Sequence, residues 1–254
     1  MIENKFVIII PVYNAINFIE KCIDSIMSQS YQNFTLITVD DGSTDGTTDI
    51  IYDLWKNEWN KSRFLFHRNG IRYGSPLRSF VTGVSLYDGD KQDIIITVDG
   101  DDWLYGDNVL DYMNDIYQDP DVWLTYGQFK SVSGNLDGYC TEVTDTRTYR
   151  RHQEWTTGHL RTLRKGLFDK INPKDFLQKD GSFYNKYNDT AYMFPAIEMA
   201  GVKHIKFIDK ILYVYNDKNP LCSIYDFDNA HLQADWDMGE EIRNKKPYDE
   251  IPEL

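Results

Sequence analysis

Residues 93–102 read DIIITVDGDD, an apolar, β-branched run that ends in three carboxylates within four residues. A short run of this kind is typical of a buried strand in a parallel sheet. Ligands of such sheets bind beyond the carboxyl ends of the strands, so we expect Asp99, Asp101 and Asp102 at a ligand site. Three neighbouring anions repel one another, and a divalent cation with oxygen ligands would neutralise them. The alternative is a polar turn in which Gly100 supplies the bend.

The sequence on either side of this run alternates between strand-like and helix-like patterns. Strands are predicted at 6–10, 34–39, 64–66 and 94–98, with an amphipathic helical pattern after each. This order predicts an α/β fold with a mostly parallel central sheet and helices on both faces. Beyond residue 121 the alternation of strand-like and helix-like patterns weakens. Helices are predicted there at about 158–170 and 188–200, and apolar runs recur at 202–208 and 211–215.

The bulk composition sets the class of protein. The chain has 254 residues, 41% of them hydrophobic, which is sufficient for a globular core. Its formal net charge of −13 argues against nucleic acid as a partner, since phosphate binding needs a basic face. The three cysteines form no CxxC pair, and no segment approaches the roughly 20 apolar residues of a membrane span. These observations favour a cytoplasmic protein without a transmembrane segment.

Three short polar motifs follow predicted strands of the sheet. They are PVYN at 11–14, DDGSTDGT at 40–47 and DGDD at 99–102. Because parallel strands end at the same edge, the three motifs are expected to converge on one cleft. In this combination, and with the arginine-bearing segment GSPLR at 74–78, the chain resembles the family 2 glycosyltransferases. These are nucleotide-sugar-dependent, inverting enzymes of the GT-A fold, which is Rossmann-like.

The resemblance is strong over about residues 5–105 and reaches about residue 215 through weaker motifs. It implies a single GT-A domain over residues 1–225. About 1–105 would be the nucleotide-sugar-binding half and about 106–225 the acceptor-binding half. Residues 226–254 are then an acidic C-terminal tail, in which Trp236, Met238 and Ile242 suggest one short helix.

The resemblance also implies roles in binding the donor. Tyr13 would stack on the nucleotide base, and Asp41, with Asp40 beside it, would accept a hydrogen bond from a base N–H. Arg72 and Arg78 would contact the diphosphate, because a guanidinium can fork onto phosphate oxygens. The expected donor is a UDP-sugar. The full set of expected nucleotide-sugar contacts is Pro11, Tyr13, Asp40, Asp41, Arg72, Arg78, Asp99 and Asp101.

Asp99 and Asp101 match the DxD motif of the family. The resemblance makes Asp101 the main ligand of Mn²⁺ or Mg²⁺ on the diphosphate and Asp99 a second acidic contact, to the metal or to the donor's ribose or sugar. Asp102 would orient the site. Many relatives carry a histidine after a later apolar strand, whereas this chain reads LYVYNDKNP at 212–220. Lys218 or Asn219 would then replace the histidine, or water would complete the metal shell.

The base that an inverting transfer requires is expected on a later helix. Asp189 matches the family position, although Asn188 stands where relatives commonly have Glu. The alternative role for Asp189 is that of a helix N-cap.

The acceptor side is expected around the basic segment at 147–170. Trp155, His159 and Arg161 resemble an acceptor-binding loop, and the alternative is a solvated basic amphipathic helix. The acceptor itself stays open among a glycan, a lipid-linked sugar and a protein. A catalytically silent sugar- or nucleotide-sugar-binding protein of the same fold is the alternative to an enzyme.

Overall fold

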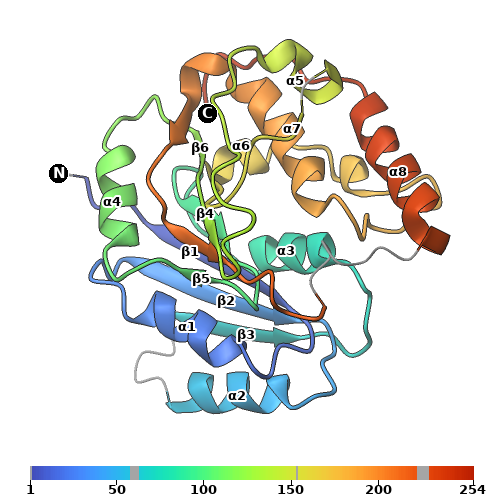
Figure 1. The fold of residues 1–254 in the computed structure, drawn as a ribbon. Coiled ribbons are helices and arrows are strands. Elements are labelled where there is room, and N and C mark those ends of the chain that lie inside the picture. The colour runs from blue at the N-terminus through green and yellow to red at the C-terminus, as the bar shows by residue number, and fades with distance from the viewer. Residues whose placement is uncertain (1, 58–62, 153, 222–228) are drawn as a thin grey trace.

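The computed structural model describes residues 2–57, 63–152, 154–221 and 229–254 (Figure 1). Within these residues the main sheet has seven strands in the order β3-β2-β1-β4-β8-β6-β9. Its strands are β1 (Phe6–Val12), β2 (Phe34–Asp40), β3 (Phe64–Arg68), β4 (Ile94–Thr97), β6 (Leu124–Gly127), β8 (Thr162–Arg164) and β9 (Ile205–Ile208). A smaller sheet joins β5 (Trp103–Leu104), β10 (Tyr213–Tyr215) and β7 (Lys130–Ser131).

The register of the central strands brings the polar motifs to one edge. β1 is parallel to both β2 and β4, with Val12 opposite Asp40 and Ile9 opposite Thr97. The three chain segments that leave these strands therefore start side by side, as the sequence predicts.

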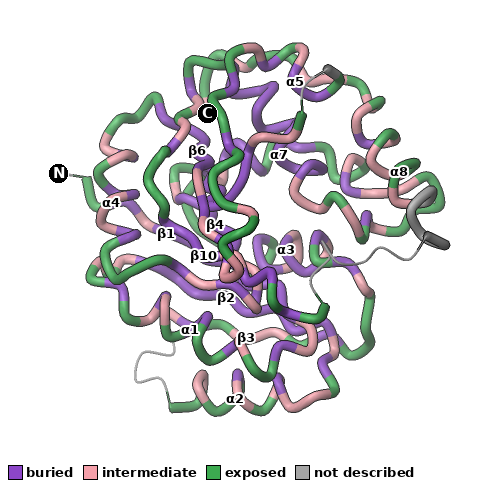
Figure 2. The backbone as a smooth tube through the Cα atoms, viewed as in Figure 1, coloured by how far each residue is buried: buried purple, intermediate pink, exposed green. Residues whose placement is uncertain are grey.

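Helices cover both faces of the sheet because the strand side chains alternate between the faces. Phe6, Ile8 and Ile10 of β1 share one core with α1 (Ile19–Met27), α2 (Thr47–Asn57) and α4 (Val109–Ile116). Val7 and Ile9 belong to a second core with α3 (Pro76–Ser85), α6 (Lys165–Phe168), α7 (Asn188–Ala200) and α8 (Asn229–Asn244). The central strands are accordingly buried along their length (Figure 2). The predicted α/β architecture is confirmed.

The helix predicted at 158–170 is wrong. Residues 162–164 instead form β8, which runs antiparallel between β4 and β6, and only residues 165–168 are helical. The arginines nearest β8 are buried, whereas Arg147, Arg151 and Lys170 are exposed. Arg164 is buried and its Nε donates to the carbonyl of Val122, 2.9 Å away. A strand inserted between two others needs no 3.6-residue pattern, so tertiary pairing overrides the helical spacing of the basic side chains.

The remaining elements are α5 (Thr146–His152) and two short 3₁₀ helices, Pro173–Phe176 and Val202–His204. The predicted domain boundary at 225–226 lies outside the described residues. Part of the expected acidic tail packs on the body, since Ile242 of α8 is buried in the second core. Cys22 and Cys140 are buried free thiols, and Cys222 lies outside the described residues. Among the described helices, none has the length and apolar character needed to span a bilayer.

Candidate functional site

A cavity of about 490 Å³ opens where β1 and β4 end, and we call it the strand-end cavity. Six of the eight predicted nucleotide-sugar contacts line it, from the turns after β1, β2 and β4 and from the loop before α3. They are Pro11, Tyr13, Asp41, Arg72, Asp99 and Asp101. The structure thus brings together residues that are up to 90 positions apart in the chain.

Asp41 fixes the loop that forms one side of this cavity. Its carboxylate accepts hydrogen bonds from Asn69 Nδ2 at 2.8 Å and from the backbone N–H groups of Tyr73 and Gly74 at 3.0 and 2.7 Å. The same loop carries Arg72, whose guanidinium lies 3.9 Å from the ring centroid of Tyr13. An arginine stacked on an aromatic face marks a surface that also accepts a planar base.

Asp40 and Arg78 are not among the residues that line the strand-end cavity. Asp40 is fully buried and accepts from the Ser43 N–H at 2.9 Å and from the hydroxyls of Ser43 and Thr48 at 2.6 and 2.5 Å. Arg78 lies over the ring of Tyr73 at 3.3 Å. Asp40 therefore braces the DDGSTDGT turn, and Arg78 packs on the residue that follows Arg72.

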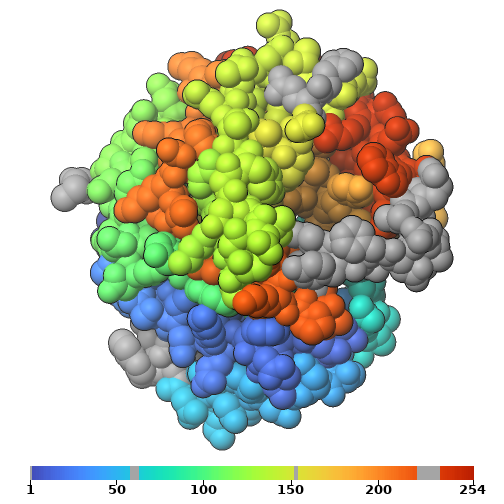
Figure 3. All heavy atoms as spheres, viewed as in Figure 1, coloured from blue at the N-terminus to red at the C-terminus, as the bar shows by residue number. Residues whose placement is uncertain are grey.

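The DGDD turn is clamped by the segment around β10. Asp102 accepts from Tyr213 Oη at 2.6 Å and from the Asn216 N–H at 2.7 Å, in keeping with the orienting role expected for it. Asn219 Nδ2 donates to Asp101 Oδ2 at 2.7 Å, so one of the two residues named as a substitute for the family histidine does reach the motif. Figure 3 shows this face, where the yellow-green segment around β7 lies beside the orange segment around β10.

Burial raises the pKa of all three carboxyl groups in the turn, and for Asp99 and Asp102 the neighbouring carboxylates raise it further. Burial and the neighbouring Asp101 raise the pKa of Asp99 to about 7. Burial also raises the pKa of Asp101, and burial together with Asp101 and Asp99 raises the pKa of Asp102 well above its usual range. Clustered carboxyl groups that are hard to ionise favour the binding of a hard divalent cation, because its charge stabilises their ionised form.

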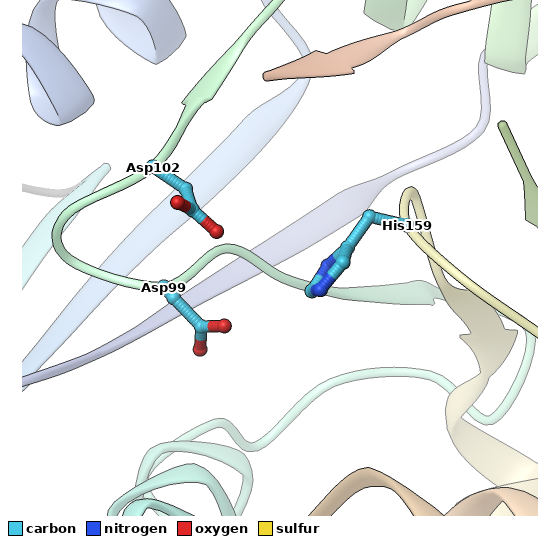
Figure 4. Close-up of side chains that lie close together, drawn as sticks. All are labelled: Asp99, Asp102 and His159. Atoms are coloured by element: carbon cyan, nitrogen blue, oxygen red, sulfur yellow. The ribbon is translucent and has the colours of Figure 1, made fainter. Parts of the chain in front are cut away.

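One possible metal-ligand group lies at this turn. Asp99, Asp102 and His159 each offer an atom, and these atoms lie within 4.8 Å of one another among the described residues (Figure 4). His159 is buried and stacks on Tyr213, with 4.3 Å between ring centroids. Burial and Arg161 hold its pKa well below the usual range, so the imidazole is neutral. Asp101, the expected main ligand, is not in this group.

The sequence offered no direct sign that His159 would lie beside the DGDD turn. Many relatives carry a histidine after a later apolar strand, at a position where this chain has none, whereas His159 comes from the loop that leads into β8. The only available signal was the resemblance of residues 155–161 to an acceptor-side loop. The antiparallel pairing of Ile96 with Thr162 is what brings that loop next to Asp99.

A second cavity of about 500 Å³ adjoins the first, and we call it the aromatic cavity. It is lined by all three expected acceptor residues, Trp155, His159 and Arg161, and by Asp189. Arg161 is buried, and its NH2 group lies 2.7 Å from Asp189 Oδ2. Burial is the largest single influence and opposes the arginine's charge, but Asp189 together with Tyr192, Tyr139 and Asp99 outweighs it, and the pKa of Arg161 is raised.

Asp189 lies in the first turn of α7 and is not its N-cap. The N-cap is Tyr187, whose backbone is left-handed with φ of 53°. The partly exposed Asp189 carboxylate does both: Oδ1 accepts a hydrogen bond from the Thr190 N–H at 2.9 Å in the first turn of α7, and Oδ2 faces Arg161 in the aromatic cavity.

The two cavities share a boundary at which Asp99 lies. Seven residues line both: Pro11, Pro76, Asp99, Lys186, Tyr187, Asn188 and Tyr215. Asp101 lines only the strand-end cavity, and Asp189 lines only the aromatic cavity. The acids of the turn and the candidate base therefore line two adjoining cavities that share Asp99.

The parallel sheet, the acidic turn at its edge and the paired cavities have the architecture of GT-A glycosyltransferases. The family model described as "Glycosyl transferase family 2" matches residues 7–183, and the chain belongs to this family.

Named relatives share parts of the chain. It is 33% identical over 109 residues to the glycosyltransferase GlyA of Streptococcus pneumoniae, which covers 43% of this chain and 14% of GlyA. It is 29% identical over 137 residues to GlyG of the same organism, which covers 53% of this chain and 43% of GlyG. The chain therefore matches less than half the length of each of these relatives.

Solved structures share the fold. Residues 1–349 of S. aureus TarS in complex with UDP superimpose with a TM-score of 0.61 at 19% identity, covering 84% of this chain and 60% of that one. A mannosyltransferase from Pyrobaculum calidifontis, in complex with GDP-Man and Mn²⁺, gives a TM-score of 0.57 at 18% identity, covering 83% and 56%.

Proposed function

We propose that this chain is an inverting glycosyltransferase that moves a sugar from a UDP-sugar to a hydroxyl group of an acceptor. The observation that carries the proposal is the meeting of two cavities at Asp99, with Asp101 on one side and Asp189 on the other. Inversion by a single displacement needs a base on the face opposite the leaving diphosphate, and the assignment of Asp101 and Asp189 to different cavities supports this placement.

The strand-end cavity is the proposed donor site. Tyr13 would offer a ring face to the base, and Arg72, which lies over that ring in the structure, would reach the diphosphate. The seven residues shared with the aromatic cavity would surround the donor sugar at the boundary, where C1 meets the acceptor oxygen.

The acidic turn is the proposed metal site. Asp99, Asp101, Asp102 and His159 are the candidates to hold Mn²⁺ or Mg²⁺, since their oxygen and neutral nitrogen atoms suit these ions. When bound, the ion stabilises the charge that grows on the departing diphosphate. The relative bound to GDP-Man and Mn²⁺ supports this assignment by fold.

Asp189 is the proposed general base. Arg161 holds Oδ2 of its carboxylate at 2.7 Å and fixes the side chain toward the aromatic cavity. The carboxylate would take the proton of the acceptor hydroxyl as the oxygen attacks C1, and no covalent nucleophile is needed.

A screen of nucleotide sugars tests this function. Thermal shifts and release of nucleoside diphosphate are measured for UDP- and GDP-sugars with and without Mn²⁺. We expect a UDP-sugar to stabilise the chain only with the metal and to be turned over slowly by water. Binding of a UDP-sugar without any turnover, in the presence of acceptors, would instead indicate the catalytically silent alternative.

A further inference from the structure

The helix α8 forms a wall of the aromatic cavity, although it lies beyond the residues that the family model matches. Asp235, Gly239 and Arg243 of this helix all line the cavity. They are spaced four residues apart and therefore lie along one face of the helix. Figure 1 shows α8 (red) beside α7, the helix that carries Asp189.

Other contacts fix α8 in this position. Ile242 is buried in the second core, and Met238, four residues earlier, packs against the same core. Glu241 accepts a hydrogen bond from Tyr184 Oη at 2.8 Å, and Arg243 donates to the backbone carbonyl of Arg150. The helix is thus held by its apolar face and by polar contacts, which leaves the Asp235 face for the cavity.

Gly239 allows α8 to approach the start of α7 closely. A Cβ atom at this position would lie 3.1 Å from the ring of Tyr187, tighter than most real contacts of this kind. Tyr187 precedes Asn188 and Asp189 and lines both cavities. The face of α8 that carries Gly239 therefore packs against Tyr187, two residues before the proposed base Asp189.

The charges around the aromatic cavity do not suit an anionic ligand. Its arginines are engaged, Arg161 with Asp189 and Arg243 with a backbone carbonyl, and Lys186 also has a partner. A phosphate or carboxylate ligand would need donors that are open to it. The cavity instead combines aromatic walls, among them Trp155 and Tyr187, with carboxylates that accept hydrogen bonds.

Buried polar atoms in the same cavity lack partners. Within the described residues, neither His159 Nδ1 nor Asn188 Oδ1 has a hydrogen-bond partner. A buried polar group without a partner is costly, and a ligand hydroxyl that reaches either atom would remove that cost. Aromatic faces beside hydroxyl-binding groups form the surface that a sugar ring requires, because the ring has apolar C–H faces and a polar rim.

We propose that the aromatic cavity takes a neutral sugar ring as the acceptor and that Asp235 of α8 binds one of its hydroxyl groups, which makes α8 the wall that selects the acceptor. The proposal rests on the proposed function, because it names the acceptor class of that site. It assigns a binding role to a helix that the sequence marks only as part of an acidic tail.

Binding of simple glycosides tests this role independently of turnover. The probes are methyl glycosides of glucose, galactose, mannose and N-acetylglucosamine, titrated against the full chain by saturation-transfer NMR with UDP and the diamagnetic Mg²⁺ present. We expect at least one glycoside to bind, and Asp235→Ala to weaken its binding about tenfold through loss of one charge-assisted hydrogen bond. Asp235→Asn, which keeps the side-chain shape, should weaken it less.

The matched control is Trp236→Ala, which removes a 65% exposed side chain from the neighbouring position of the same helix. It should leave glycoside binding unchanged, and all variants should keep the wild-type melting temperature. Equal binding by wild type and Asp235→Ala overturns the proposal, as does absence of binding by every glycoside. Tighter binding of glucose 6-phosphate than of methyl glucoside also overturns it. If the proposed function is wrong, the wild-type chain will show no metal-dependent binding of a UDP-sugar, which is a separate measurement from the glycoside titration.

Discussion

The two cavities are built in different ways. The strand-end cavity takes its acidic and aromatic motifs from turns that directly follow three neighbouring parallel strands, so each of these motifs is contiguous in the sequence. The aromatic cavity is assembled mainly from α3, the loop before β8, the start of α7 and the face of α8. Local sequence therefore encodes the motifs of the first cavity, whereas long-range packing assembles the second. This difference predicts which substitutions affect the donor and which affect the acceptor.

The largest effect is expected from Asp189→Asn. This change removes the proposed base but keeps the size of the side chain beside Arg161. Transfer should fall by about 10²–10⁴-fold, the usual contribution of a positioned base, while the Kd of UDP stays unchanged. Steady-state kinetics and calorimetry measure the two quantities. Normal transfer by the variant, or retained anomeric configuration in the product, would refute the assignment.

Asp101→Ala should affect only the donor side. Loss of a metal contact on the diphosphate should raise the Mn²⁺ concentration for half-maximal turnover by about 100-fold and leave the fold intact. A metal titration of turnover measures this, with circular dichroism as the control for folding. If the variant turns over at the wild-type rate in metal-free buffer, the DxD assignment is wrong.

Asn219→Ala tests the clamp on the same carboxylate. Removing the 2.7 Å hydrogen bond to Asp101 should weaken Mn²⁺ binding about tenfold, less than loss of Asp101 itself. Titration calorimetry of Mn²⁺ with UDP present gives the comparison. Unchanged Mn²⁺ affinity in Asn219→Ala would contradict a role for this hydrogen bond in positioning Asp101.

Tyr13→Ala should weaken UDP binding about tenfold through lost stacking on the base, and Tyr13→Phe should not. The expected order of affinity for the wild type is UDP ahead of GDP and ADP. Calorimetry with the three nucleotides measures both effects. Tighter binding of GDP or ADP would contradict the preference assigned to Tyr13 and Asp41.

The smallest effect is a pH dependence of stability. The folded-state pKa of Asp99 is raised from 3.8 to about 7 by burial and Asp101, so its stabilising contribution is present at acid pH and is lost as pH rises through 7. Metal-free wild type should therefore lose stability relative to Asp99→Asn between pH 6 and pH 8, by a few degrees in Tm. Differential scanning fluorimetry at both pH values checks this. A gap of the same size at pH 6 and pH 8 would contradict it.

The contrast between the cavities also explains what the sequence predicted. The strands ending in PVYN, DDGSTDGT and DGDD could be read locally, and their parallel register placed Tyr13, Asp41 and Asp101 together. The helix expected at 158–170 was wrong because β8 is stabilised by pairing with β4 and β6, which no local pattern records.

The sequence could not predict that α8 lines the aromatic cavity, because this also depends on long-range packing. The four-residue spacing of Asp235, Gly239 and Arg243 is visible in the chain, but nothing in it shows that this face meets Tyr187. The proximity of His159 to Asp99 likewise depends on strand pairing alone.

The insertion of β8 into the sheet has a consequence for how such a protein diversifies. Its ladder pairs Ile96 with Thr162, one residue beyond Arg161, so a single-residue insertion or deletion next to β8 would turn inward side chains outward. Insertions and deletions next to β8 would therefore disrupt the side chains that this strand and the loop before it present to the aromatic cavity. A peripheral helix has no such constraint, since residues on one of its faces change one at a time without disturbing a ladder. New acceptor preferences can thus evolve on α8 while the sheet and its acidic turn stay fixed.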